Sequence, residues 1–444
     1  MKRTQVTGDL LLATSSELAQ KLGGYVVLML LSRHVDKGRM GELFFAVTVA
    51  TFAAAVTELG TSRYLLREVA GSPARALARL GEVLALRIPL LAAAFVVLNA
   101  AVLALRPELS VLFLLTSAYV LVGDLYYSYG AFFLGVRRVG LRAATGAGGQ
   151  LLLVAVVAAG VALGLSLPAI LGGYVAASAL TVGASALVVR RQFGRVPLAW
   201  DAGVARRVAG VSAPFFLLTA LGLAHSKADT AMLFALASPV AVASYEAGYK
   251  LLEVSRFAVR PAVMIFFPIA AVMAARAEWT GIAALVRRLV GVAGALGVVT
   301  AAAVLAAASA VVPLVWGAQY ADAVPILRVL SLTIPSLFVG TVALFLAGAL
   351  HVERAAVLVT AATLVAIVAI NAVAIPRWGA LGAAWCTLLT ETALTAGVMA
   401  LVVRRLRAAQ TTARSAAPPP ARGTPDLAAN DLAANDLAAN AANG

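Results

Sequence analysis

Five side chains that can bind a ligand or carry charge recur at helical spacing in the C-terminal half of the chain. They are Tyr245, Tyr249, Glu253, Arg256 and Arg260, and they follow one another at intervals of four, four, three and four residues. This spacing places all five on one face of an α-helix. The surrounding residues are largely apolar, and a charged side chain in the middle of a bilayer costs about 2.5–3.5 kcal/mol on insertion scales. We therefore expect this face to border a water-filled cavity, where the arginines could bind phosphate oxygens, although Arg260 could instead extend to the lipid headgroups.

Two pairs of opposite charges lie one helical turn apart in other apolar positions. Glu17 stands four residues before Lys21, and Glu246 stands four residues before Lys250. Residues at this spacing are neighbours on a helix and can form ion pairs. Each pair has two interpretations: a structural ion pair that locks helices together, or groups that face a cavity and bind a ligand.

Further ionisable residues stand singly in apolar runs. His225 and Asp229 are one turn apart, whereas Lys227 is expected to point elsewhere. Asp124 lies near the middle of its apolar run, and Arg87 lies closer to the start of another. Acids and bases inside a membrane often mark ligand or ion pathways. The alternatives stay open, because a buried histidine is more often structural and Arg87 could extend to the headgroups.

The composition of the chain excludes most soluble classes of protein. Of its 444 residues, 62% are hydrophobic and 12% are charged, and the mean hydropathy is +0.95. A soluble domain has about 25% charged residues, so a soluble enzyme, a disordered protein and a nucleic-acid binder are all disfavoured. Three histidines and one cysteine, with no H-x-x-x-H or H-E-x-x-H pattern, predict no transition-metal site. The sequence predicts an all-α polytopic membrane protein.

Apolar runs between charged or Pro/Gly breaks predict about twelve transmembrane helices. A bilayer requires about 20 apolar residues for each crossing. The predicted spans are 9–31, 41–60, 81–105, 109–134, 143–165, 167–189, 209–235, 239–270, 289–312, 329–350, 356–375 and 380–403. The first span is interpreted as a retained helix and not a cleaved signal peptide, because its polar residues interrupt any hydrophobic signal region; without it, eleven helices would remain.

The longest connection between spans divides the chain into two halves. We predict an N-terminal six-helix bundle at residues 1–190, a cytoplasmic linker at 191–208 and a C-terminal six-helix bundle at 209–405. A disordered cytoplasmic tail is predicted at 406–444, which holds a proline run and three Asp-Leu-Ala-Ala-Asn repeats. A partner-binding role for these repeats is the alternative.

Basic residues between the spans predict the orientation of the chain. Of the 35 lysines and arginines, 23 fall on the side that holds both termini, six fall on the other side and six lie within spans. Lysine and arginine hold loops in the cytoplasm. Both termini are therefore predicted to be cytoplasmic.

Glycines and prolines have packing interpretations. Gly146, Gly148 and Gly149 are spaced like a phosphate loop, but the Lys-Ser/Thr that a nucleotide site requires does not follow them. Close packing of helices explains these glycines better. Prolines that are expected to kink or hinge the C-terminal spans are Pro214, Pro261, Pro268, Pro325 and Pro335.

Several segments of the chain resemble the polysaccharide flippase family. Residues 32–70 carry an arginine in a turn, then a glycine and an aromatic residue, a Leu-Gly pair and an Arg-Glu pair, which are Arg33, Gly41, Phe44, Leu59–Gly60 and Arg67–Glu68. Asp229, Met232, Tyr245 and Tyr249 resemble the junction of the seventh and eighth helices of that family. Similar segments follow, VWGAQYADAVPILRVLS and NAVAIPRWGALGAAW.

This resemblance implies a fold and a substrate class. The fold is that of the multidrug/oligosaccharidyl-lipid/polysaccharide exporters, in which two six-helix bundles surround a central cavity that opens alternately to each side. The implied function is a flippase in the bacterial plasma (inner) membrane, with no enzymatic activity. Its substrate would be an undecaprenyl-diphosphate-linked oligosaccharide, moved from the cytoplasmic to the periplasmic leaflet for surface polysaccharide such as O-antigen. Polysaccharide polymerase or chain-length machinery are candidate protein partners.

The charged and aromatic residues then acquire candidate roles. The residues expected to bind the diphosphate and the sugars are Lys21, Arg87, Lys250, Arg256 and Arg260. Tyr245 and Tyr249 could stack on sugar rings. The candidates for coupling to a proton or a sodium ion are Glu17, Asp124, Asp229 and Glu253. No catalytic residue, metal or cofactor is expected.

Three rival functions remain at this point. A cation-coupled multidrug exporter of the same fold would need an acidic cavity, whereas the span at 239–270 carries more bases than acids. A membrane-embedded glycan polymerase or glycosyltransferase generally has a large outer loop, but the longest one here is Pro313–Arg328. A lipid II flippase usually has two additional helices.

Overall fold

The protein is built from helices. The computed structural model describes residues 3–198, 202–256 and 260–416, and every regular element in these ranges is an α-helix or a 3-10 helix. The N-terminal half contains α1 (Arg3–His34), α2 (Lys37–Glu58), α3 (Thr61–Gly71), α4 (Ala76–Leu105), α5 (Ser110–Gly135), α6 (Val139–Ala162) and α7 (Leu167–Gln192). The C-terminal half contains α8 (Ala202–Leu236), α9 (Pro239–Ser255), α10 (Arg260–Ala275), α11 (Trp279–Trp316), α12 (Ala323–Ser331), α13 (Ile334–Ala349) and α14 (Glu353–Ala416). Short 3-10 helices are η1 (Pro73–Arg75), η2 (Pro107–Leu109) and η4 (Ala318–Tyr320).

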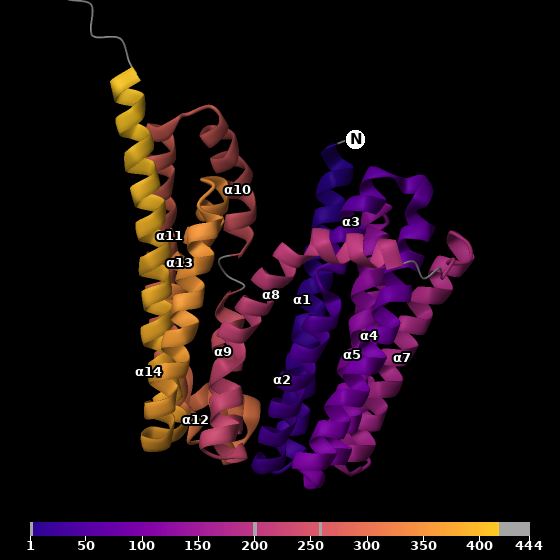
Figure 1. Ribbon diagram of the computed structural model, residues 1–444. Helices are drawn as coiled ribbons and strands as arrows, with labels where there is room; N and C mark the ends of the chain where they lie inside the picture. Colours follow the sequence, from indigo (N-terminus) through magenta and orange to yellow (C-terminus); the bar gives the residue numbers. More distant parts are fainter. Residues whose placement is uncertain (1–2, 199–201, 257–259, 417–444) are drawn as a thin grey trace, which may run out of the picture.

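The helices form two bundles that lie side by side (Figure 1). In the N-terminal bundle α1 packs on α6, and α5 packs on α4 and α7. In the C-terminal bundle α13 packs on α11 and α14. Helix α8 joins the two: Val208, near its start, is buried in the core of the N-terminal bundle, and the helix also packs on α9 and α14. The predicted all-α fold of two bundles is confirmed.

Helix lengths account for twelve crossings of a membrane. The N-terminal half supplies six long helices, α1, α2, α4, α5, α6 and α7. In the C-terminal half, α8 and α11 supply one crossing each, α12 with α13 forms one bent span, and α9 with α10 corresponds to the single predicted span 239–270. Residues 353–412 of α14 form a 60-residue apolar helix that is kinked at Gly379 (φ 55°). An α-helix rises about 1.5 Å per residue, so this length exceeds the roughly 30 Å bilayer core several times, and α14 supplies two crossings.

Not every helix of the fold is both long and apolar enough to be recognised alone as a membrane span. Among the described residues, seven helices are, and the bent pair of α12 and α13 makes eight. Helices α1 and α8 are long but less apolar, and they carry Lys21 and Lys227 respectively. Helix α9, which carries Lys250, has 17 residues and is too short to be recognised on its own.

The eighth predicted span is broken, which corrects the expected continuous polar face. Helix α9 ends at Ser255, Arg256 forms its C-cap, and α10 begins at Arg260. Pro261 is the physical reason, because proline fits the first turn of a helix and the residue before it disfavours helical geometry. The common face thus extends from Tyr245 to Arg256 only, and the side chain of Arg260 lies outside the described part of the chain.

Two helix boundaries differ from the predicted segments. Helix α14 continues to Ala416, past the predicted start of the tail at 406, because residues 404–416 are mostly alanine, arginine and other residues that a helix tolerates. Residues 417–444, which hold the repeats, are outside the described residues. Helix α8 begins at Ala202, inside the predicted linker at 191–208.

The Leu59–Gly60 pair marks a helix break that the spans did not include. Both residues have left-handed backbone angles, with φ of 48° and 74°. The Glu58 carboxylate accepts hydrogen bonds from the backbone N–H of Gly60 at 2.7 Å and of Ser62 at 2.8 Å. These bonds satisfy free N–H groups at the start of α3, which is therefore a separate short helix between α2 and α4.

The two bundles are tied together on one side of the molecule. We call the side where α1 begins and α14 ends the termini side, and the opposite one the distal side. On the distal side Lys37 of α2 forms an ion pair with Asp322, which also accepts a hydrogen bond from Ser244 of α9 at 2.8 Å. The Gln319 side chain donates to the Ser32 carbonyl of α1. We call these contacts the distal seam: Lys37–Asp322 and Gln319–Ser32 connect one bundle with the other, and the Ser244 bond holds Asp322 within the C-terminal bundle.

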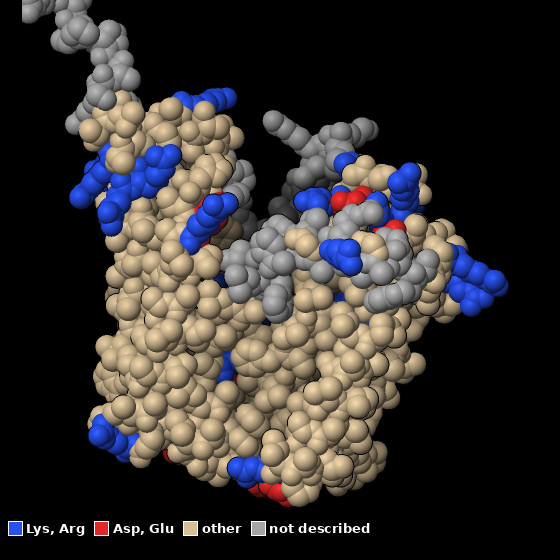
Figure 2. All heavy atoms as spheres, viewed as in Figure 1, with Lys and Arg blue, Asp and Glu red and all other residues tan. Residues whose placement is uncertain are grey.

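Close backbone packing completes the distal seam. A Cβ atom at Gly41 would lie 1.7 Å from the carbonyl oxygen of Pro239, so α2 and α9 touch at their first turns. The rings of Phe45 and Phe234 stack across the same interface, with centroids 3.7 Å apart. On the termini side, α10 stands apart from α1 and α3 (Figure 1), and Figure 2 shows a notch between the two halves there. The structure is closed on the distal side and parted on the termini side.

We expect Gly41→Ala to open the distal seam, because its Cβ would overlap the Pro239 carbonyl. Overpacking costs about 1–3 kcal/mol, which changes the ratio of two conformations by about fivefold or more. Lys37→Cys and Asp322→Cys, introduced together, report on the seam, because these side chains pair across it. Their cross-linking yield should fall when Gly41→Ala is added.

Gly291→Ala is the matched control, because a Cβ at Gly291 meets no atom within 4 Å. The native Cys386 is buried and would be replaced by alanine throughout. An equal cross-linking yield with glycine and with alanine at position 41 would contradict the assigned role of this contact.

Candidate functional site

A cavity of about 310 Å³ lies between the two bundles. Its walls come from α1, α2, α5, α6 and α7 of the N-terminal bundle and from α9 of the C-terminal bundle. The charged side chains in the wall are Lys21, Lys250 and Glu253, and the Lys250 ammonium donates to the Glu253 carboxylate at 2.9 Å. Lysines therefore outnumber acids two to one among the charged residues of the wall.

The remaining wall of this central cavity is largely apolar. Val27, Leu43, Phe44 and Leu171 line it beside the lysines, together with the amphipathic Tyr25. Such a wall suits a molecule that has both an anionic group and a hydrocarbon part, because each part meets side chains of matching chemistry.

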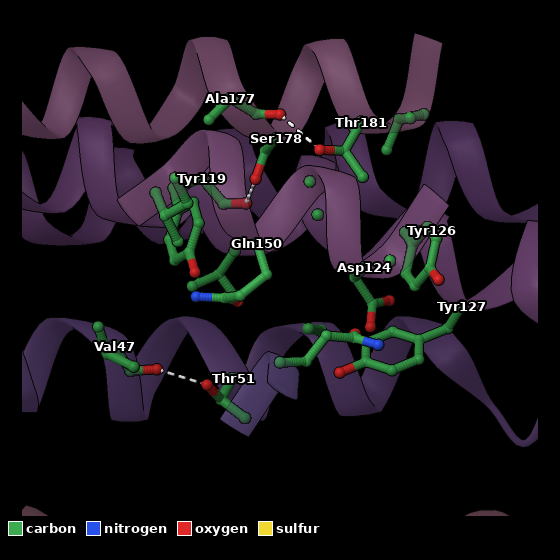
Figure 3. A pocket seen from close by; sticks show the side chains of 18 residues that line it. Val47, Thr51, Tyr119, Asp124, Tyr126, Tyr127, Gln150, Ala177, Ser178 and Thr181 are labelled. Carbon is green, nitrogen blue, oxygen red and sulfur yellow. Dashed lines mark hydrogen bonds between the residues drawn. The ribbon is translucent and has the colours of Figure 1, made fainter. Parts of the chain in front are cut away.

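A second pocket, of about 360 Å³, lies inside the N-terminal bundle (Figure 3). We call it the N-bundle pocket. It shares Val47, Tyr119, Gln150 and Leu153 with the central cavity, so the two spaces adjoin. The predicted residue Asp124 is part of its wall.

Arg87 and Asp124 form an ion pair within the N-terminal bundle. Arg87 of α4 is completely buried, and its guanidinium contacts the Asp124 carboxylate and donates to Ser128 Oγ at 2.7 Å. This burial does not match an extension of the Arg87 side chain to the headgroups. The pair joins α4 to α5, which positions Asp124 at the pocket wall.

Asp229 is the centre of a buried polar cluster in the C-terminal bundle. Its carboxylate accepts hydrogen bonds from the Tyr245 hydroxyl at 2.8 Å, from the Thr387 hydroxyl at 3.1 Å and from the Asn371 amide. Asp229 lies on α8, Tyr245 on α9, and Asn371 and Thr387 on the two arms of α14. Within the described residues the groups that donate to this carboxylate are neutral, and His225 lies one turn away on the same helix.

Glu246 and Lys250 do not form an ion pair with each other, which corrects the interpretation of these two residues as a structural ion pair. Glu246 is buried and accepts from the Lys227 ammonium at 3.2 Å and from Thr230. Lys227, which was expected to point elsewhere, therefore turns toward α9, and its ammonium lies 5.8 Å from the Tyr249 ring centroid. Lys250 pairs with Glu253 one turn further along α9. Helical spacing allows Lys250 to pair with either Glu246 or Glu253. Because α8 packs on α9, Lys227 reaches Glu246, and Lys250 pairs with Glu253.

The other predicted binding residues of α9 lie within the C-terminal bundle. Tyr245 and Tyr249 are buried and stack on each other, with ring centroids 5.7 Å apart, so neither ring offers a free face to a sugar in this conformation. Arg256 pairs with Glu391 of α14 at 3.2 Å, and both line a third pocket of about 190 Å³ that also includes His225. Arg256 therefore lies outside the wall of the central cavity.

Glu17 lies on α1, where Arg142 of α6 pairs with it at 3.5 Å. Of the predicted residues with described side chains, Lys21, Lys250 and Glu253 meet in the central cavity, and Asp124 borders the adjoining pocket. Within the described ranges no cluster of three His, Cys, Asp or Glu side chains could hold a metal ion.

Several residues of these sites carry no charge and were missed. Asn371 and Thr387 bind Asp229, and Gln150 and Tyr119 separate the two adjoining spaces. A neutral polar residue in an apolar run is common in membrane helices, so its type alone gave no signal. The glycines at 146 and 149 did give a signal in the sequence. Gly146 packs against Tyr126 and Gly149 against Thr181, as the close-packing interpretation predicted.

The chain matches a known protein family in sequence, and its fold is similar to those of solved transport proteins. Residues 6–273 match the model of the polysaccharide biosynthesis protein family. No curated protein matches the chain. The solved structure of an inward-facing multidrug resistance MATE transporter of the MOP superfamily has a TM-score of 0.66 at 14% identity, over 88% of this chain and 96% of that one.

Two other structures extend the comparison. The lipid II flippase MurJ in an inward closed conformation has a TM-score of 0.66 at 9% identity, over 90% of each chain. A MOP superfamily transporter from Pyrococcus furiosus, described by the reverse polarity of its binding pocket, has a TM-score of 0.62 at 12% identity, over 92% of this chain and 96% of that one. At these identities the likeness concerns the fold.

We expect Arg87→Leu to destabilise the protein strongly, because it leaves the Asp124 carboxylate without its cation. Removing one partner of a buried ion pair costs about 3–5 kcal/mol, whereas replacing both by apolar residues often costs little. The double variant Arg87→Leu with Asp124→Leu should therefore recover much of the loss. Thermal unfolding in detergent micelles measures both variants, and equal melting temperatures for the single and double variants would contradict the structural role of the pair.

Proposed function

Because the chain belongs to the polysaccharide biosynthesis protein family, we propose that it is a flippase for an undecaprenyl-diphosphate-linked oligosaccharide. It moves this lipid from the cytoplasmic to the periplasmic leaflet of the bacterial inner membrane by alternating access. The chain is a multi-pass membrane protein with the fold of the MATE and MurJ transporters. The substrate and the direction are our proposal.

The observation that carries this proposal is the mixed character of the central cavity. Lys21 and Lys250 supply ammonium groups that can bind a diphosphate, and Glu253 orients Lys250 through a 2.9 Å hydrogen bond. The apolar wall beside them can accept the start of a polyprenyl chain, whose remainder stays in the bilayer. A cationic drug would meet lysines of the same charge as its own, so a multidrug exporter fits this cavity less well.

The distal seam supports alternating access. Its polar contacts, such as Lys37 with Asp322, lie at the end of the helices and can exchange with water at low cost. The basic side chains visible in Figure 2 lie mainly on the termini side, which the positive-inside rule assigns to the cytoplasm. In this orientation the structure is an inward-facing state that can take up a lipid-linked substrate from the cytoplasmic leaflet.

We further propose Asp229 as the coupling site. The acids deep in the helices are Glu17, Asp124, Asp229, Glu246, Glu253 and Glu391. Five of these pair with a lysine or arginine, whereas within the described residues the hydrogen bonds to Asp229 come from the hydroxyl and amide groups of its cluster. A buried carboxylate without such a counter-ion requires a proton or a small cation. The oxygens of Tyr245, Asn371 and Thr387 could contribute to binding a sodium ion.

We expect the loss of either lysine to reduce export. A hydrogen bond to a charged group contributes about 1.5–3 kcal/mol, so Lys21→Ala or Lys250→Ala should weaken substrate binding by about tenfold or more. The double variant should abolish surface polysaccharide at normal expression. The measurement is the surface glycan of a deletion strain that carries each variant.

Arg288→Ala is the control, because Arg288 is an exposed residue of α11 away from both spaces. Full export by the double lysine variant would refute the proposed diphosphate site. A drug-sensitive deletion strain with an intact glycan coat would favour the multidrug exporter.

Asp229→Asn should uncouple transport from its ion. In proteoliposomes, flipping of a fluorescent lipid-linked oligosaccharide by the parent protein should respond to a sodium gradient or to a pH gradient, and the responding gradient identifies the ion. The variant should respond to neither, because its amide cannot carry the charge. Glu391→Gln is the matched control, since that acid already has Arg256 as its partner. A variant that keeps the full response to the gradient would exclude Asp229 as the coupling group.

A further inference from the structure

We propose that the N-bundle pocket binds the uncharged sugar of the lipid-linked substrate while the neighbouring lysines hold its diphosphate. This inference rests on the proposed function and adds a second subsite to it. The pocket lies entirely within the N-terminal bundle, with walls from α1, α2, α5, α6 and α7. Its volume of about 360 Å³ falls within the roughly 300–1,000 Å³ of small-molecule sites.

The wall of this pocket combines polar groups with apolar side chains and holds almost no net charge. Its lining includes Tyr119, Tyr126, Tyr127, Gln150 and several hydroxyl residues, and no lysine, arginine, histidine or glutamate is among the lining residues. Asp124 is the exception, and the buried Arg87 guanidinium neutralises it from behind. A phosphate would find no cation among the lining residues, and a cationic drug would find no unpaired acid. The pocket therefore suits a neutral polar ligand.

The hydrogen-bonding groups match those of a sugar. Thr51 donates to the Val47 carbonyl at 2.7 Å, and Thr181 donates to the Ala177 carbonyl at 2.8 Å (Figure 3). Each hydroxyl oxygen keeps a lone pair, so it can accept from a ligand hydroxyl. The Asp124 carboxylate adds further acceptors beside them. Sugar hydroxyls donate and accept, and they can use such a wall.

Gln150 supplies a donor that the protein does not use. Its amide nitrogen is buried and has no hydrogen-bond partner among the described residues. Figure 3 shows Gln150 and Asp124 both pointing from the helices above toward the helix that carries Thr51. A buried donor without a partner costs about 1–3 kcal/mol, and a sugar oxygen would satisfy it. Tyr119 and Tyr127 add aromatic faces for the C–H side of a sugar ring.

Glycines on the neighbouring helices leave space for the polar side chains of the pocket wall. A Cβ at Gly149 would lie 2.4 Å from Thr181 Oγ1, and one at Gly146 would lie 2.5 Å from the Tyr126 hydroxyl. A Cβ at Gly23 would lie 2.6 Å from Gln150 Cγ. Any larger residue would push a polar side chain into the pocket.

The pocket and the central cavity are placed for a single ligand with two parts. They share Tyr119 and Gln150, while Lys250 lines the central cavity but not the pocket. A diphosphate at the lysines would thus have its first sugars directed past Gln150 into the N-terminal bundle and its lipid directed along the apolar wall.

The test measures binding of two lipids to the purified full chain in lipid nanodiscs. One lipid is undecaprenyl diphosphate without sugar, and the other is the lipid-linked oligosaccharide extracted from cells that lack this chain. The parent protein should bind the glycosylated lipid about tenfold or more tightly than the bare lipid. Thr51→Leu fills the pocket from α2 and should remove this preference, with binding of the bare lipid unchanged.

Thr145→Leu is the matched control, because Thr145 bonds to its own helix in the same way but does not line the pocket. Melting temperatures of both variants show whether each is folded. Equal binding of the two lipids by the parent protein, or an unchanged preference in folded Thr51→Leu, would overturn the sugar site. Lys250→Ala separates the two proposals, because it should weaken the binding of both lipids by the same factor. If it weakens the binding of neither lipid, the diphosphate site is refuted, while the preference for the glycosylated lipid still tests the sugar site.

Discussion

A carboxylate or an ammonium group inside a bilayer must find a partner or water, because the free energy of an isolated charge there is prohibitive. This constraint organises the interior of the protein. Asp124 has Arg87, Glu246 has Lys227, and Glu253 has Lys250. Each pair connects two helices or two turns of one helix, so satisfying the charges also fixes how the helices pack. Lys21 and Lys250 line the central cavity, and Asp229 lies in a cluster of hydroxyl and amide groups, so these are the positions at which a ligand could act.

The fold could be predicted from the sequence because the same constraint requires a long run of apolar residues for every crossing of the membrane. The predicted bounds of α6 and α7, for example, lie within a few residues of the observed helices. The break between α9 and α10 was harder to foresee. Pro261 marks it in the sequence, but membrane helices often tolerate a proline without ending.

The candidate site could be predicted only in part, since a helical face shows which residues lie together and not which helix they meet. Tyr245, Tyr249, Glu253 and Arg256 do share a face of α9, yet that face divides between two environments. The tyrosines and Arg256 contact α14 or each other, whereas Glu253 reaches the central cavity. The same ambiguity explains Lys227, whose partner Glu246 lies on another helix. Neutral partners such as Asn371 gave no signal until the tertiary structure placed them beside Asp229.

Two neighbouring residues of α9 have a mechanical consequence. The hydroxyl of Ser244 donates to Asp322, and the hydroxyl of Tyr245, the next residue, donates to Asp229. Consecutive side chains of a helix point about 100° apart, so this single turn faces the outer boundary contact with one residue and the buried acid with the other. Ser244 and Asp322 both belong to the C-terminal bundle, and Asp322 in turn pairs with Lys37 of the other bundle. A rotation of this turn would therefore disturb the buried acid and, through Asp322, the ion pair that joins the two bundles.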